Sequence, residues 1–192
     1  MAELSQSAAE ASSDVAPAET EGRVSKKGRW LVWARDIGIG LLVFMGVTAY
    51  QTMDLLGSGQ EAPGFSTRDM NGQPRALADY QGKPTLMVFW APWCGVCGVE
   101  SSNISDVAEA VGDDANVISV VVGYEGLDSV REFMTEHEVD YPVLLGNSRI
   151  TKEYAVNKFP TMYILDSEGR VQHTSVGFTT ELGLRARLWA AR

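Results

Sequence analysis

Two cysteines lie close together in a chain of 192 residues that has no others, and their spacing suits redox chemistry. Cys94 and Cys97 follow an apolar run over residues 82–91 that predicts a buried strand, and a helix is expected over 94–112. The partial positive charge of a helix N-terminus stabilises a thiolate, so Cys94 should have a lowered pKa and be the attacking group. Cys97, one helical turn further on, should be more buried and should resolve a mixed disulfide on Cys94.

The elements that must position these cysteines alternate between strands and helices. The apolar patterning predicts strands over 82–91, 116–122, 141–145, 161–165 and 171–176, and helices over 94–112, 127–139, 148–155 and 182–190. The last two strands flank a turn at 166–169 and therefore predict an antiparallel hairpin. This order indicates an α/β fold with a mixed sheet and helices on both faces.

Metal chemistry fits the cysteine pair poorly. A second cysteine pair that could complete a zinc site is missing, and neither His137 nor His173 is near the pair in sequence. Gly98 occupies the position where the attachment motif of a c-type haem has histidine. We therefore predict no metal and no cofactor. His137, between two glutamates on a predicted helix, is interpreted as solvated, and neither histidine is assigned a role.

The N-terminal third predicts a membrane anchor. Residues 1–27 are rich in Ala, Ser and Glu and are expected to be disordered, and residues 37–53 form 17 positions without a charge. Five Lys and Arg between positions 23 and 35 place the N-terminus in the cytoplasm by the positive-inside rule. A buried helix of a soluble protein and a signal peptide cleaved after Ala49 are the alternatives. The predicted organisation is a disordered cytoplasmic segment, an anchor, a linker and one domain, over residues 1–27, 28–53, 54–61 and 62–192.

The overall charge excludes one class of partner. The chain has 16 Lys and Arg against 25 Asp and Glu, a net charge of -9. Phosphate binding needs clustered basic side chains, so nucleic acid is not an expected partner.

The nine residues FWAPWCGVC, from Phe89 to Cys97, resemble the active-site signature of the thioredoxin superfamily. Phe159-Pro160-Thr161 is similar to the cis-proline loop of that family, although the same three residues also occur in ordinary turns. The resemblance implies a thioredoxin-like three-layer α/β/α fold with a mixed central sheet, preceded here by one N-terminal transmembrane helix. It also implies a redox-active disulfide between Cys94 and Cys97, with Trp93, Phe159 and Pro160 binding the substrate.

Within the superfamily, the chain is most similar to the membrane-anchored branch of TlpA-like, ResA-like and suppressor-of-copper-sensitivity D-type proteins. The segment from Glu61 to Phe65 is similar to the start of that domain, and Glu100 resembles the Glu of its C-x-x-E motif. Val88 stands where cytoplasmic thioredoxins have a buried Asp, and Ser102 stands where the branch often has Pro. Glu100 is therefore the candidate proton acceptor for Cys97, and a solvated helix carboxylate is the alternative.

The resemblance and the anchor together predict a thiol-disulfide oxidoreductase of the bacterial inner membrane, single-pass, with a periplasmic domain that acts on protein dithiols and disulfides. Gly95-Val96 offers no side-chain donor to a Cys94 thiolate, which favours a reductant kept reduced by a membrane electron donor of the DsbD type. A cytochrome c maturation thiol reductase is the alternative within the class. A copper-delivery protein, a peroxiredoxin-like peroxidase and a redox-inert interaction module are the alternatives from other classes.

Overall fold

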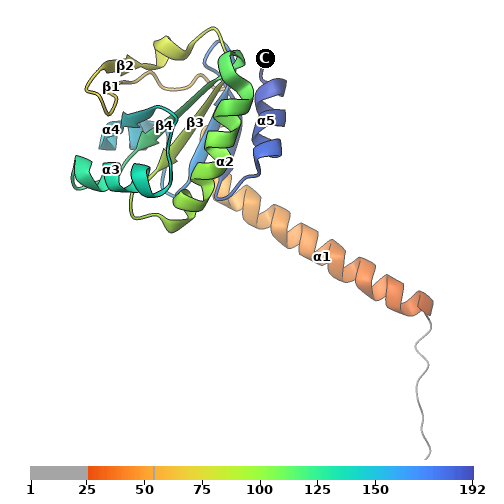
Figure 1. Ribbon diagram of the computed structural model, residues 1–192. Coiled ribbons are helices and arrows are strands. Elements are labelled where there is room, and N and C mark those ends of the chain that lie inside the picture. Colours follow the sequence, from red (N-terminus) through yellow and green to blue (C-terminus); the bar gives the residue numbers. More distant parts are fainter. Residues whose placement is uncertain (1–25, 54) are drawn as a thin grey trace, which may run out of the picture. The chain divides into compact units, whose positions relative to one another are not determined.

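The computed structural model describes residues 26–53 and 55–192 (Figure 1). Its helices are α1 (Lys26–Thr52), α2 (Gly95–Val111), α3 (Leu127–Glu136), α4 (Ser148–Glu153) and α5 (Glu181–Ala190), with 3-10 turns at Leu77–Tyr80 and Gly112–Asp114. Its strands are β1 (Ser66–Arg68), β2 (Pro74–Ala76), β3 (Thr85–Trp90), β4 (Asn116–Val121), β5 (Val143–Leu145), β6 (Thr161–Leu165) and β7 (Val171–Val176). The compact unit that contains the cysteines begins at Met45.

Helix α1 is long and apolar enough to cross a membrane. The 19 residues Val32–Tyr50 have a mean hydropathy of 1.5, and none of this stretch is buried, unlike the core helix of a soluble protein. The adjacent charges of Arg35 and Asp36 form an ion pair at 2.9 Å, which lowers their cost within an apolar segment. The helix begins at Lys26, two residues before the predicted anchor, and most of the predicted disordered segment lies outside the described residues.

A five-stranded mixed sheet forms the centre of the domain, in the order β5-β4-β3-β6-β7. Strands β3, β4 and β5 are parallel, whereas β6 and β7 run antiparallel to β3 and to each other. All six residues of β3 are buried, as the continuous apolar run predicted for a central strand covered on both faces. The hairpin of β6 and β7 was predicted, whereas the short two-stranded sheet of β1 and β2 was not.

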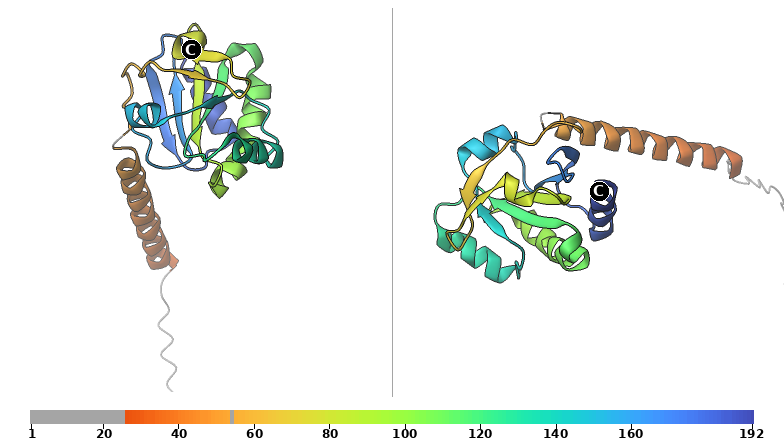
Figure 2. Two further views of the ribbon diagram at one scale, coloured as in Figure 1. Left: turned by 90° about the vertical axis from the view of Figure 1, so that its left-hand side faces the viewer. Right: turned by 90° about the horizontal axis from the view of Figure 1, so that it is seen from above.

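Alternate residues of β3 separate the core into two layers. Leu86 and Val88 pack with residues of α2 and α5, whereas Met87 and Phe89 pack with residues of α4 and of the segment before β1. Figure 2 shows α4 on one side of the sheet and α2 with α5 on the other. The three-layer α/β/α arrangement is therefore confirmed. The connection from β3 to α2 lies at the C-terminal end of the central strand β3.

Two predicted helices extend too far. Helix α3 ends at Glu136 rather than at residue 139, and α4 ends at Glu153 rather than at residue 155. Strand β5 begins at Val143 rather than at residue 141.

Candidate active site

The two cysteines form a disulfide at the N-terminus of α2. Cys94 is the N-cap residue, and its Sγ accepts a hydrogen bond from the backbone N–H of Cys97 at 3.3 Å. The two Cα atoms are 5.3 Å apart. Cys97 is 4% exposed and Cys94 is 8% exposed, so both lie under the surface and Cys97 is the more buried. The N-cap position supplies a donor that would stabilise a thiolate on Cys94 after reduction.

The loop before β6 faces this end of the molecule. The Phe159–Pro160 peptide bond is cis, as the resemblance implied, and Pro160 is buried. The ring of Phe159 meets the ring of Trp93 edge-on, with centroids 5.6 Å apart. The indole N–H of Trp93 also donates to the carbonyl oxygen of Gly123 at 3.0 Å. Trp93 is thus fixed by two contacts although 69% of its surface is exposed, and the three residues predicted to bind substrate lie together.

Glu100 lies one helical turn after Cys97 and is fully buried. Both of its carboxylate oxygens accept the backbone N–H of Thr179, at 3.2 and 3.1 Å. Burial raises the pKa of Glu100 to about 7, and the hydrogen bonds from Thr179 and Asn103 oppose this rise. The alternative of a solvated helix carboxylate is therefore wrong, because the loop between β7 and α5 covers the side chain.

Polar contacts continue around Glu100, whereas β3 contributes no carboxylate. The Ser101 and Tyr141 hydroxyls hydrogen-bond at 2.8 Å in the interior, and burial raises the pKa of Tyr141 to about 12. Val88, at the position of the thioredoxin Asp, is buried in an apolar cluster. Among the residues of α2 and β3, Glu100 is therefore the buried carboxylate, and it lies one helical turn after Cys97.

His137 was interpreted as solvated, whereas the structure shows it half-buried. Its ring lies against Gly98, where an added Cβ would be only 2.4 Å from the imidazole Cε1. The ring also packs on Phe133 at 4.4 Å between centroids, and Phe133 stacks on Trp90 at 4.2 Å. A glycine inside a helix costs about 1 kcal/mol relative to alanine. A glycine at position 98, directly after Cys97, was therefore the sequence signal that another side chain approaches the helix closely at this turn.

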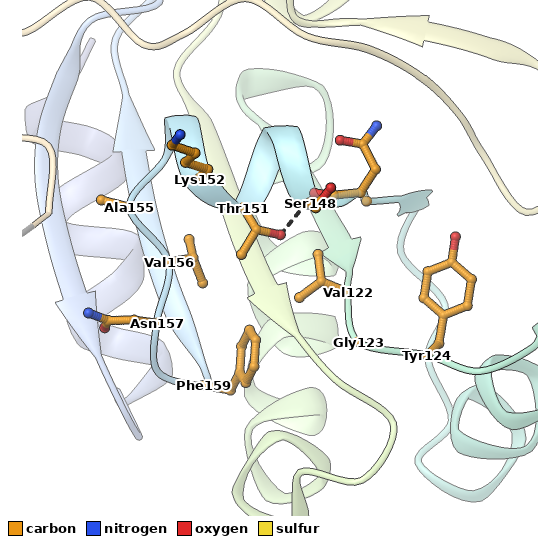
Figure 3. A pocket seen from close by; sticks show the side chains of 12 residues that line it. Val122, Gly123, Tyr124, Ser148, Thr151, Lys152, Ala155, Val156, Asn157 and Phe159 are labelled. Atoms are coloured by element: carbon orange, nitrogen blue, oxygen red, sulfur yellow. Dashed lines mark hydrogen bonds between the residues drawn. The ribbon is translucent and has the colours of Figure 1, made fainter.

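Two cavities flank the cysteine end of the fold and share Gly123 and Tyr124 as walls. The larger, of about 840 Å³, extends from Phe159 past Val122 to Thr151 and Lys152 of α4 (Figure 3). The hydroxyl of Thr151 donates to the carbonyl oxygen of Asn147 at 2.9 Å, which closes the first turn of α4 on this wall. The smaller cavity, of about 420 Å³, lies between Trp93 and helix α3. Within the described residues, no three His, Cys, Asp or Glu side chains form a group that could hold a metal.

Comparison with known proteins identifies the family of this chain. The model of one protein family, the AhpC/TSA family, matches residues 58–174. The chain belongs to the AhpC/TSA family. Thioredoxin-like protein YneN of Bacillus subtilis is 31% identical over 169 residues, covering 83% of this chain and 96% of that protein. Thiol-disulfide oxidoreductase ResA of the same organism is 30% identical over 162 residues, covering 81% and 90%.

Solved structures agree on the fold. A putative thiol:disulfide interchange protein DsbE from Chlorobium tepidum has a TM-score of 0.66 at 24% identity, over 71% of this chain and 98% of that one. The chain is thus an AhpC/TSA-family protein with a thioredoxin-like fold, and its relatives identify it as a thiol-disulfide oxidoreductase of the ResA type.

Proposed function

We propose that this protein is a membrane-anchored periplasmic reductase of protein disulfides that works through Cys94 and Cys97. The observation that carries the proposal is the position of the pair at the N-cap of α2, opposite Phe159 and Pro160, with buried Glu100 one turn behind Cys97. Cys94 attacks, Cys97 resolves, and Trp93 with the loop before β6 holds the partner polypeptide.

In the first step, the Cys94 thiolate of the reduced protein attacks one sulfur of a substrate disulfide. The substrate S–S bond breaks, a mixed disulfide forms on Cys94, and the second substrate sulfur leaves as a thiolate that takes a proton from solvent. The partner chain lies extended along the backbone of Phe159, in the manner of an added strand. Exposed Trp93 contributes apolar contact area beside the reacting sulfurs.

In the second step, Cys97 loses its proton to the carboxylate of Glu100 and attacks Sγ of Cys94. The mixed disulfide breaks, the substrate sulfur leaves as a thiolate, and the Cys94–Cys97 disulfide is restored. The substrate has then gained two electrons and the protein has lost two. A pKa of about 7 suits Glu100 to this task, because a base is most effective when its pKa is near the working pH.

The surroundings of Cys94 support the role of a reductant. Its sulfur accepts a hydrogen bond from the backbone N–H of Cys97, and Gly95-Val96 adds no side-chain donor. Weak stabilisation of the thiolate leaves the disulfide form favoured, which corresponds to a low reduction potential. A membrane dithiol donor of the DsbD type then restores the reduced pair. Equilibration with glutathione tests this, because a potential near the value of about -120 mV typical of DsbA would overturn the reductase assignment.

Helix α1 serves as the anchor, with the N-terminus in the cytoplasm and the domain beyond the inner membrane. The basic residues before and inside the start of α1 favour this orientation. Fusion of a reporter that is active only outside the cytoplasm to the C-terminus should give signal, and carbonate-resistant membrane association should separate an anchor from a cleaved signal. Signal from a cytoplasm-only reporter would overturn the orientation.

The exchange chemistry itself is tested by trapping. Full-length protein with Cys97→Ser should accumulate mixed disulfides with protein partners through Cys94, because the resolving thiol is gone. The matched control carries Cys94→Ser and should accumulate few or none. Equal trapping by the two variants would contradict the assigned roles.

A further inference from the structure

The smaller of the two cavities beside the cysteine pair has an unusual wall. Three of its side chains are aromatic and three are carboxylates, namely Trp93, Tyr124 and Phe133 with Glu125, Glu132 and Glu136. We call this cavity the acidic pocket. Because Trp93 directly precedes Cys94, a polypeptide bound at the reactive sulfur must pass close to its opening.

The carboxylates of the acidic pocket are arranged by α3. Glu132 and Glu136 are four positions apart, so they lie one above the other on the helix, and Phe133 between them in sequence points to the buried side. Both are exposed, as is Glu125 in the loop before the helix. Among the ion pairs of residues 26–53 and 55–192, none includes any of these three glutamates. Arg131, the basic residue next to Glu132 in sequence, is paired with Asp128 at 2.9 Å.

The aromatic walls are held in place before any partner binds. Trp93 is fixed by its hydrogen bond to Gly123 and its edge contact with Phe159, and Phe133 is stacked on buried Trp90. Flat, fixed rings suit the aliphatic stem of a lysine or arginine, and their faces attract its cationic end. The pocket thus offers apolar walls for a stem and carboxylates for a positive charge.

We propose that the acidic pocket receives a lysine or arginine side chain of the partner polypeptide, a few residues from the partner's reactive cysteine. The inference rests on the proposed exchange through Cys94 and names the kind of substrate sequence that this site prefers. A metal ion is a poor occupant, because the described residues contain no group of three His, Cys, Asp or Glu close enough to hold one. The neighbouring larger cavity has Lys152 and no carboxylate in its wall, so the preference for a basic residue is confined to one side of the site.

Peptide disulfides test this preference with the full-length protein in detergent. Three peptides identical except for Lys, Met or Glu near the cysteine are made in two sets, with the variable residue on either side of it. Stoichiometric oxidation of the reduced protein gives a second-order rate constant for each. In one set we expect Lys to exceed Met by about fivefold and Glu to react slowest, because exposed charge pairs are modest but here three act together.

Matched variants separate the pocket from the overall negative charge. Glu132→Gln with Glu136→Gln should bring the Lys-to-Met ratio below about twofold. Asp106→Asn with Glu109→Gln removes the same charge from exposed positions of α2 and should keep the ratio. Both double variants should react with uncharged hydroxyethyl disulfide as the wild type does. Equal loss of the ratio in both would overturn the pocket in favour of net charge.

Two further outcomes distinguish this inference from the proposed function. Equal rate constants for all the peptides, with normal reduction of hydroxyethyl disulfide, would overturn the acidic pocket alone. Failure of the reduced protein to react with any disulfide would overturn the proposed function, and the pocket's role with it.

Discussion

The first turns of α2 have two sides that differ in nearly every respect. On one side, Cys94 caps the helix beside Trp93, which is 69% exposed, and beside the ring of Phe159. On the other, Cys97 lies in a buried cluster with Val130 and Phe133 of α3, and Glu100 is covered by the loop that carries Thr179. The exposed side has the area and open geometry that a partner polypeptide needs.

The covered side lacks solvent and therefore changes the chemistry of its groups. Burial raises the pKa of Glu100 to about 7, whereas an exposed glutamate remains ionised at neutral pH. The comparison teaches that one helix terminus can serve partner contact and proton transfer separately, because exposed Trp93 lies directly before Cys94 whereas buried Glu100 lies one turn after Cys97.

The largest effect should come from replacing the two cysteines one at a time. Cys94→Ser should abolish reaction with peptide disulfides, because the attacking sulfur is lost. Cys97→Ser should keep the first step within about threefold of the wild type, since the N-cap donor is a backbone N–H that the substitution retains. Stopped-flow mixing with a peptide disulfide measures both. A Cys97→Ser protein that fails to form the mixed disulfide would remove the distinction between the two sides.

The burial of Glu100 predicts a pH-dependent stability. Its pKa is raised from 4.5 to about 7, so the unfolded chain loses this proton first as the pH rises, and folded stability falls between about pH 4.5 and 7. The loss is at most about 3.5 kcal/mol, from about 1.4 kcal/mol for each of the roughly 2.5 units. Urea unfolding of Glu100→Gln should lack this decline, because glutamine does not ionise.

The same variant tests the proposed proton transfer. Glu109→Gln is the matched control for both measurements, since Glu109 is an exposed carboxylate of the same helix. It should keep the wild-type profile of stability against pH. Turnover of Glu100→Gln should be slower and should lose its inflection near pH 7. An unchanged pH–rate profile together with an altered stability profile would make Glu100 structural only.

The contact between Gly98 and His137 predicts a smaller change. Gly98→Ala places a Cβ 2.4 Å from the imidazole Cε1, so the His137 ring or the backbone that carries it must shift, at a cost of about 1–3 kcal/mol for overpacking. Alanine's better helix propensity offsets about 1 kcal/mol of this. His137→Ala in the same chain should restore the stability by removing the ring. Absence of such rescue in thermal unfolding would mean that the loss of stability does not come from the contact between the added methyl group at position 98 and the His137 ring.

Much of the fold could be predicted because its central elements have strong local signals. The apolar run of β3 and the turn between β6 and β7 gave the mixed sheet and the hairpin. Strands β1 and β2 have three residues each, too few for a period-2 pattern to emerge. The predicted ends of α3 and α4 were too late because their chains turn at Glu138 and Ala155, non-glycine residues with φ of 51° and 50°. A helix end without glycine carries little sequence signal.

The features of the candidate active site also differ in whether local sequence could predict them. The cysteine pair and the cis-proline loop could be located from short motifs, because each motif is local. The C-x-x-E motif also pointed to Glu100, but the segment that buries it could not be predicted, since the N–H that it binds belongs to Thr179, 79 residues further on. The position of His137 against Gly98 likewise depends on how α3 packs against α2. Contacts between distant segments therefore decide what the covered side does, whereas local sequence indicates the exposed side.

The smallest predicted effect is at the exposed side itself. Trp93→Ala should lower the second-order rate constant for peptide disulfides by about three- to tenfold, because exposed aromatic side chains often contribute about 1 kcal/mol or more to polypeptide contacts. Oxidation by hydroxyethyl disulfide should change by less than about twofold, since that molecule is too small to use the indole. Trp189→Ala is the matched control, because Trp189 of α5 is 71% exposed and far from the cysteines in sequence, and it should change neither rate. Equal slowing with both disulfides would mean that Trp93 acts on Cys94 rather than on the partner, and the exposed side would then be part of the chemistry as the covered side is.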